Sequence, residues 1–179
     1  MILQGNQRGG SRDLANHLLS PENDHVELHS LRGFAADDLH GALHEAYAVS
    51  RGTRCKQFLF SLSLNPPPNE QVGTQAFESA IERIEQKLGL SDQPRAVIFH
   101  EKDGADGQTR RHAHAVWSRI DTDKMKAVPL PFTHKRLREM SRQLYVEHGW
   151  SMPRGGVTAG HIAVALCPQP IPPVGVEDV

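Results

Sequence analysis

Short stretches of the chain either alternate apolar and polar residues or are strongly apolar, and both patterns predict β-strands. Longer stretches carry apolar residues three or four positions apart, which predicts helices. The predicted strands are residues 1–4, 25–31, 56–64, 95–100 and 110–119, and the predicted helices are residues 12–19, 37–50, 74–88 and 133–148. Helices interspersed with strands, and a hairpin formed by the last two strands, predict an α+β fold. In it, helices pack on a mostly antiparallel (mixed) sheet of about five strands.

Polar residues and glycines mark the expected ends of these helices. Ser11 is a predicted N-cap of the first helix. Asp37 and Asp38 suit the positive N-terminal end of the second helix. Gly52 and Gly89 are expected to end the second and third helices. The signals therefore delimit separate helices between the strands.

The length and composition of the chain indicate one domain. The chain has 179 residues, and we expect a domain over residues 1–154 followed by an irregular Gly/Pro-rich tail over residues 155–179. The formal net charge is -1, so binding to nucleic acid would need a local basic patch. Two cysteines provide no disulfide framework and fit a reducing compartment. No apolar run reaches the length of a membrane span and no signal peptide is recognisable, so we expect a cytoplasmic protein without membrane insertion.

Three histidines form the strongest candidate for a chemical site. His112 and His114 point to the same face of a strand, because side chains alternate along it. If the last two strands pair as a hairpin, His100 ends one strand as His112 begins the next, and three imidazoles can converge on one ion. Three neutral imidazoles with an open coordination position suit a catalytic divalent metal. The ion should be released as the pH falls toward about 6.

The order of the motifs along the chain is distinctive. A short N-terminal helix carries a candidate nucleophile, and the run Phe60–Asn65 leads into a proline-rich break. The His-x-His pair is followed by an apolar strand and by Ser118-Arg119-Ile120-Asp121. This order resembles the relaxases, or mobilisation nucleases, of conjugative and mobilisable elements, and most of all the branch that includes the agrobacterial T-DNA border nuclease. The resemblance covers about residues 1–150.

The resemblance implies a fold of the HUH endonuclease class, with an antiparallel sheet and helices. It implies a metal-dependent nick of one DNA strand at an origin of transfer, with the enzyme attached to the 5′ phosphate and a free 3′ hydroxyl; rejoining reverses the steps. The implied cofactor is Mg²⁺ or Mn²⁺, although imidazole donors also accept other transition ions. The implied partners are single-stranded DNA and accessory relaxosome proteins. We expect a monomer in the bacterial cytoplasm, encoded on a mobile element such as a plasmid.

The nucleophile departs from the family pattern, in which most members use an N-terminal tyrosine. Tyr47 shares a helix face with apolar residues, so we expect it in the core, and Tyr145 follows the metal motif. At the family's tyrosine position this chain has His17. Because another relaxase branch uses histidine, we expect His17 to attack and form a phosphohistidine link. His25 is the second candidate.

Basic residues beside these motifs are the expected DNA contacts, because arginine and lysine hold phosphate oxygens. They are Arg8, Arg12, Arg51, Arg54, Lys56, Arg110 and Arg111. The basic helix over residues 133–148 is interpreted as a solvated face. Trp117 alternates away from the histidines and is expected in the core.

Three other functions share parts of this pattern. The first is a relaxase-like protein that binds DNA without nicking it. The second is a metal hydrolase of small phosphorylated substrates, but the chain lacks the two His-x-Thr/Ser repeats of the 2H phosphoesterases. The third is an HUH replication initiator, in which a tyrosine on a late helix attacks; this gives Tyr145 a role.

Overall fold

Strands and helices alternate along the chain in a computed structural model, which describes residues 1–20, 25–103 and 109–153. The strands are β1 (Ile2–Arg8), β2 (His25–Arg32), β3 (Leu59–Asn65), β4 (Arg95–Asp103), β5 (Thr109–Ser118), β6 (Ile120–Asp121) and β7 (Lys126–Ala127). The helices are α1 (Ser11–Leu18), α2 (Leu39–Ser50), α3 (Thr74–Leu88) and α4 (Thr133–Glu147). None of these helices combines the length and apolar character needed to cross a bilayer. The expected tail over residues 155–179 lies outside the described residues.

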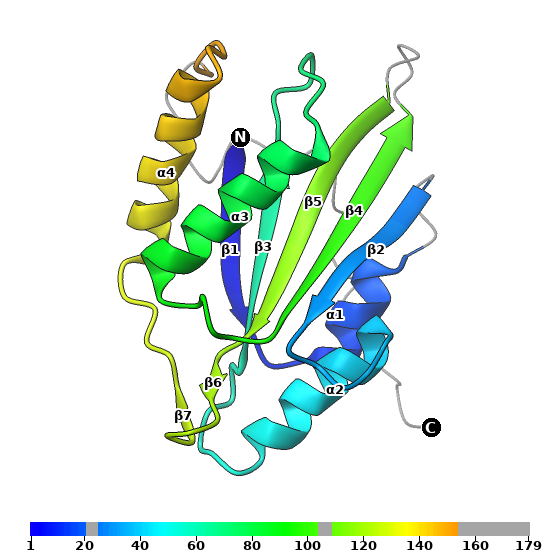
Figure 1. The fold of residues 1–179 in the computed structure, drawn as a ribbon, viewed down its shortest axis with the longest axis vertical. Coiled ribbons are helices and arrows are strands. Elements are labelled where there is room, and N and C mark those ends of the chain that lie inside the picture. Colours follow the sequence, from blue (N-terminus) through cyan, green and yellow to red (C-terminus); the bar gives the residue numbers. More distant parts are fainter. Residues whose placement is uncertain (21–24, 104–108, 154–179) are drawn as a thin grey trace, which may run out of the picture.

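Five strands form one sheet in the order β1-β3-β5-β4-β2, and every neighbouring pair is antiparallel (Figure 1). The short strands β6 and β7 form a separate hairpin. The predicted α+β class with a five-stranded antiparallel sheet is therefore confirmed.

Helices pack on both faces of this sheet. On one face, α3 and α4 pack over a core that includes Leu62, Phe99 and Trp117. On the other face, α1 and α2 pack over a second core that includes Leu59 and Ile98. We refer to these as the α3–α4 face and the α1–α2 face. Two cores arise because successive residues of the central strands point to opposite sides, and each side carries several apolar side chains.

The first strand is longer than its sequence suggests. Residues 1–4 were expected as the strand, yet β1 runs to Arg8 because it pairs with β3 along its whole length. Gly5 lies within β1, where a Cβ atom would stand 2.6 Å from the Phe60 ring and 2.7 Å from a Leu137 methyl group. The glycine thus permits close packing of α4 on the sheet and does not begin a turn.

The predicted end signals are confirmed for the start of α2 and the end of α3 and wrong for the start of α1. Asp38 is the N-cap of α2, and its carboxylate accepts a hydrogen bond from the Gly41 backbone N–H at 2.9 Å. Ser11 is the first residue of α1, so its prediction as N-cap is wrong; Gly10 occupies that position without a side-chain cap. Gly89 adopts a left-handed φ of 75° directly after α3, as expected for a helix-ending glycine.

A buried carboxylate ties α3 to three strands on the α3–α4 face. Glu85 of α3 is 3% exposed and accepts hydrogen bonds from Arg32 at 2.9 Å, from Arg95 at 2.9 Å and from the Trp117 indole at 2.8 Å. These donors come from β2, β4 and β5. A buried charge is tolerated when it is paired in this way.

Replacing Glu85 by glutamine is expected to destabilise the fold, because the two guanidinium groups lose their buried counter-charge. The expected loss is about 3 kcal/mol in the free energy of unfolding, in the range for breaking a buried ion pair. Urea denaturation followed by circular dichroism measures it. Glu82→Gln, at an exposed position of the same helix, is the matched control. Equal stability of the two variants would contradict a structural role for the Glu85 charge.

Candidate active site

Three histidines meet on the α1–α2 face of the β4–β5 hairpin. His100 of β4 is directly opposite His112 of β5, and His114 is opposite Ile98. The ring centroid of His100 lies 5.1 Å from that of His112 and 4.6 Å from that of His114. The ring centroids of His112 and His114 are 5.1 Å apart. One nitrogen from each ring lies within 4.8 Å of the other two, and all three side chains are buried. The arrangement follows the register that the sequence predicted.

One of the three imidazoles is held in a defined orientation by the backbone of α1. The Nε2 atom of His100 lies 2.7 Å from the Leu18 carbonyl oxygen. A carbonyl can only accept, so Nε2 carries the hydrogen and Nδ1 is left without one in the neutral ring. Metal-binding histidines are commonly oriented by donating their second ring nitrogen to a carbonyl or carboxylate. His100 therefore fits a ligand that binds through Nδ1.

The three imidazoles are poor bases, because they are buried and lie close to one another. Burial is the main cause that lowers the pKa of His112 to about 4, and the charge of His100 adds to it. Burial likewise lowers the pKa of His100 and, far more strongly, that of His114. All three are neutral at neutral pH, which is the form that binds metal ions. Proton competition is therefore expected well below pH 6, lower than the sequence suggested.

These donors fit a divalent metal ion. They are neutral, they converge, and one of them has its tautomer set by the backbone. Among the described residues no carboxylate or thiolate joins the group. Three imidazoles alone leave further coordination positions for water or a phosphate oxygen, whereas a structural zinc site would be closed by a fourth protein ligand.

The metal-free protein is expected to lose stability in acid between pH 6.5 and about 4. In this interval the unfolded chain binds a proton at His112, whose ordinary pKa is 6.5, whereas the folded chain does not. The unfolded state is therefore favoured as the pH falls, and the penalty is complete near pH 4. For His112 alone the loss is about 3 kcal/mol, at about 1.4 kcal/mol per pH unit. Urea denaturation in EDTA across this range tests it, and His112→Gln should reduce the pH dependence.

His17 lies beside this cluster in the last turn of α1. Its side chain is exposed, while Leu14, Ala15 and Leu18 of the same helix are buried in the core. The next residue, Leu18, supplies the carbonyl that His100 contacts. The charge of His17 also contributes to lowering the pKa of His100 and His114. α1 therefore presents an exposed imidazole next to the three buried ones.

The other candidate nucleophiles lie away from the three histidines. Tyr145 is 2% exposed and packs beside Ile2 and Trp150, and burial raises its pKa. His25 is paired with Glu101, one residue out of step with His100, so it points away from the α1–α2 face. The expected core position of Tyr47 is wrong, because this side chain is 38% exposed; its ring lies between Phe58 of the core and the surface residues His44 and Arg51.

Two of the predicted DNA contacts that flank His112 differ in direction. Arg110 alternates with His112 and is opposite Lys102, so both basic residues share the face of the three histidines. Arg111 points to the other face, where it lies over the Phe99 ring at 4.0 Å and pairs with Glu27 at 3.2 Å. The structure therefore brings Arg110 to the site and gives Arg111 internal partners.

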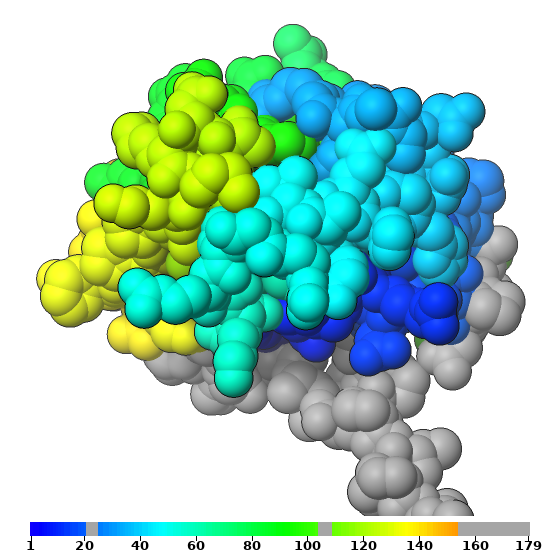
Figure 2. Space-filling model, turned by 90° about the horizontal axis from the view of Figure 1, so that it is seen from below, coloured from blue at the N-terminus to red at the C-terminus, as the bar shows by residue number. Residues whose placement is uncertain are grey.

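The remaining predicted contacts lie toward the opposite end of the sheet. Arg8 ends β1, and exposed Arg12 lies in the first turn of α1. The segment with Arg51, Arg54 and Lys56 lies just before Leu59, the first residue of β3. Leu59 is four residues, or about 13 Å of strand, from Ser63, which is opposite His114. Viewed from this lower end, α2 and the residues after it form much of the surface (Figure 2).

A row of polar side chains next to the histidines was not predicted from the sequence. Ser63 of β3 is directly opposite His114, and Gln4 of β1 is opposite Ser63. With Asn6, these side chains continue the α1–α2 face toward the edge strand, and none of them is buried. Lys102 was missed as well. The alternation in β3 and β4 was a usable signal, but the pairing partners could not be read from the sequence.

Part of the motif after His114 has a structural role. Arg119 is buried and donates hydrogen bonds to the Gln57 carbonyl at 2.7 Å and the Val128 carbonyl at 2.9 Å. A further hydrogen bond joins it to Gln7. Arg119 thus fixes the end of β5 to the segments around β1 and β7, away from the three histidines.

An antiparallel sheet with three histidines on its central hairpin and an N-terminal helix beside them defines an α+β protein with a candidate metal site. A family model described as "Relaxase: MobA/VirD2-like, nuclease domain" matches residues 16–150. The chain therefore belongs to this family of relaxase nuclease domains. The match includes His17 and all three histidines of the cluster.

Two other comparisons add little to this assignment. No curated protein gives a significant match. A solved structure from work on the molecular basis of vancomycin resistance transfer in Staphylococcus aureus is 11% identical, with a TM-score of 0.46. That match covers 84% of this chain and 94% of the other. At this level the likeness carries no argument, and the assignment rests on the family match.

Proposed function

We propose that this protein nicks and rejoins one DNA strand at an origin of transfer, in a metal-dependent transesterification, and serves mobilisation or conjugation. The observation that supports it most is the contact between α1 and the histidine cluster. His17 and the Leu18 carbonyl are adjacent in α1, and that carbonyl is bonded to His100. The candidate nucleophile and the candidate metal ligands therefore belong to one arrangement.

In the proposed step, a neutral His17 imidazole attacks the scissile phosphorus through its unprotonated ring nitrogen. A phosphorus–nitrogen bond forms and the bond from phosphorus to the 3′ oxygen breaks. The 3′ oxygen takes up a proton from solvent, and the attacking imidazole loses its ring proton to solvent. The products are a 5′-phosphohistidine link and a free 3′ hydroxyl, and rejoining reverses the step.

We assign His100, His112 and His114 to holding a divalent ion, Mg²⁺ or Mn²⁺, with other transition ions also suited to imidazole. When bound, such an ion supplies Lewis-acid polarisation of the scissile phosphate. The protein's own part is to keep the three rings neutral, to orient His100 through Leu18, and to position His17.

We infer that the scissile strand follows the open part of the α1–α2 face. Arg110 and Lys102 are on one side of the histidines, and Ser63 and Gln4 are on the other. Cationic and hydroxyl or amide side chains are the usual partners of phosphate oxygens. Arg8 at the end of β1 and Arg12 in the first turn of α1 extend the candidate contacts toward the opposite end of the sheet, where Arg51, Arg54 and Lys56 are available to flanking DNA.

We further propose that residues 1–154 act as the nuclease domain and that it works as a monomer in the bacterial cytoplasm. A mobile element would encode it, together with accessory relaxosome proteins that present the single strand. Membership of the relaxase nuclease family supports these assignments. Size-exclusion chromatography with light scattering tests the monomer.

The decisive experiment looks for a covalent adduct. The protein is incubated with Mn²⁺ and a labelled single-stranded library of random sequence, then separated on a denaturing gel. A DNA-linked protein band that is absent in EDTA supports the proposal, and sequencing the attached DNA identifies the nick site. DNA binding without any adduct would instead support the alternative of a DNA-binding relative that has lost nicking. The initiator alternative requires Tyr145, which is buried in α4 away from the cluster.

A further inference from the structure

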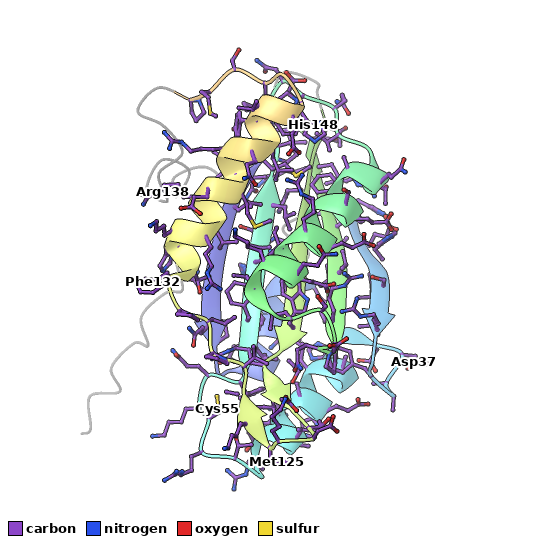
Figure 3. The ribbon with its side chains drawn as sticks, turned by 60° about the vertical axis from the view of Figure 1, so that its left-hand side comes forward. Asp37, Cys55, Met125, Phe132, Arg138 and His148 are labelled. Atoms are coloured by element: carbon purple, nitrogen blue, oxygen red, sulfur yellow. The ribbon has the colours of Figure 1, made fainter. Side chains whose placement is uncertain are left out.

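The outward side of α4 combines exposed cations with an exposed aromatic ring. Lys135, Arg138 and Arg142 are exposed and follow one another at intervals of three and four residues, so they form a stripe along one side of the helix. Phe132 precedes the stripe at the N-cap position and is 78% exposed. Figure 3 shows Phe132 and Arg138 on the outer side of α4. We call these four residues the α4 stripe.

Several charged groups near the α4 stripe have partners within the protein. Glu147 of α4 is paired with Arg83 at 2.6 Å, and Arg136 reaches the Lys87 carbonyl. Within the part of the chain that the structure describes, the side chains of Lys135, Arg138 and Arg142 make no hydrogen bond or ion pair. Their three positive charges are therefore available to an anionic partner.

Phe132 has an unusual backbone as well as unusual exposure. Its φ is 56°, in the left-handed region that bulky residues rarely adopt. An aromatic residue there loses the free energy of burial and carries backbone strain, and strain of this kind is found mainly at functional positions. The ring is thus presented to solvent by a local conformation that costs stability.

We propose that the α4 stripe binds single-stranded DNA outside the nicking site, with Phe132 stacking on a base and the three cations holding phosphates. Aromatic rings beside a basic track are the combination that binds single strands without sequence preference. The eight residues from Lys135 to Arg142 span about 10 Å along the helix axis, enough to engage more than one phosphate. α4 packs on the α3–α4 face, opposite the histidines, so the bound segment is distinct from the scissile phosphate. The inference rests on the proposed function only in taking DNA as the partner.

Fluorescence anisotropy with labelled oligo(dT), in EDTA and over a range of salt, tests the proposal without any nicking. The triple variant Lys135→Gln, Arg138→Gln, Arg142→Gln should bind at least about tenfold more weakly at low salt. Its plot of log K against log salt concentration should become less steep by about 2, at about 0.7 per lost phosphate contact. Lys126→Gln, at an exposed lysine of β7, is the matched control. Equal binding by the triple variant and this control would overturn the proposal, even if the protein nicks DNA.

Two substitutions separate stacking from stability. Phe132→Leu keeps an apolar side chain without a ring, and Phe132→Asn suits the left-handed backbone and should unfold at the same or a higher temperature. Both should weaken oligo(dT) binding about tenfold, with an unchanged salt slope and little effect on a matched duplex. Undiminished oligo(dT) binding by Phe132→Asn, or an equal loss for duplex and single strand, would overturn the stacking role. If the variants bound oligo(dT) normally but lost binding to a partner protein, the assignment to DNA would be overturned.

Discussion

Replacing His17 by alanine is expected to abolish the covalent protein–DNA adduct and to lower the nicking rate by about 10⁴-fold or more, as removal of a nucleophile does in other enzymes. The variant should fold as the unmodified protein does, because the His17 side chain is exposed and outside the core. DNA binding should persist, because the candidate phosphate contacts are untouched. The measurement is adduct formation on the site identified from the random library, with equal thermal stability as a requirement.

His25→Ala and Tyr145→Phe are the matched controls, since each removes another candidate nucleophile. Both should keep the adduct. The link itself gives a second readout: a phosphorus–nitrogen bond to histidine hydrolyses in acid, whereas a phosphotyrosine survives there. An acid-stable adduct that persists in His17→Ala and disappears in Tyr145→Phe would replace the proposed nucleophile and support the initiator chemistry.

Local periodicity was enough to predict the helices and the hairpin. The bounds of α3 agree with the prediction, because apolar residues at helical spacing lead directly to Gly89. The His100–His112 register followed from alternation and a short connection. β1 was too short in the prediction because its second half is stabilised by β3, a partner more than 50 residues away that glycine and polar residues cannot reveal.

Those features of the site that depend on the alternation of side chains within one strand were predictable from the sequence. Contacts between two separate elements were not. Alternation places His112 and His114 together, and applied to Arg111 it would have turned that residue away from the site. The contact between His100 and Leu18 joins residues 82 positions apart in the sequence, so only the packing of α1 on the sheet reveals it. For the same reason the sequence could propose His17 from the family pattern but could not show that α1 lies beside the cluster.

Replacing His114 by alanine is expected to weaken Mn²⁺ binding by more than about 100-fold, because even residues that only orient a ligand cost 10- to 100-fold. Burial lowers the pKa of His114 well below its usual value, and the centroid of its ring lies 4.6 Å from that of His100 and 5.1 Å from that of His112. Without it, two imidazoles remain, and a labile ion such as Mn²⁺ is not retained by two neutral donors alone. Isothermal titration calorimetry at pH 7.5 measures the affinity directly, independent of nicking.

His40→Ala is the control for this comparison, because His40 is an exposed histidine of α2 outside the cluster. It should bind Mn²⁺ as the unmodified protein does. Since the pKa of His112 is about 4, affinity in the unmodified protein should change little between pH 7.5 and 6, whereas exposed histidines would lose the ion there. Metal binding that falls steeply across this interval, or that survives in His114→Ala, would place the ion elsewhere. The roles of the nucleophile and of the metal ligands can thus be tested separately. His17→Ala should lose the DNA adduct and keep full Mn²⁺ affinity, whereas His114→Ala should lose both the adduct and Mn²⁺ binding. This pattern is the one expected for two parts of one site.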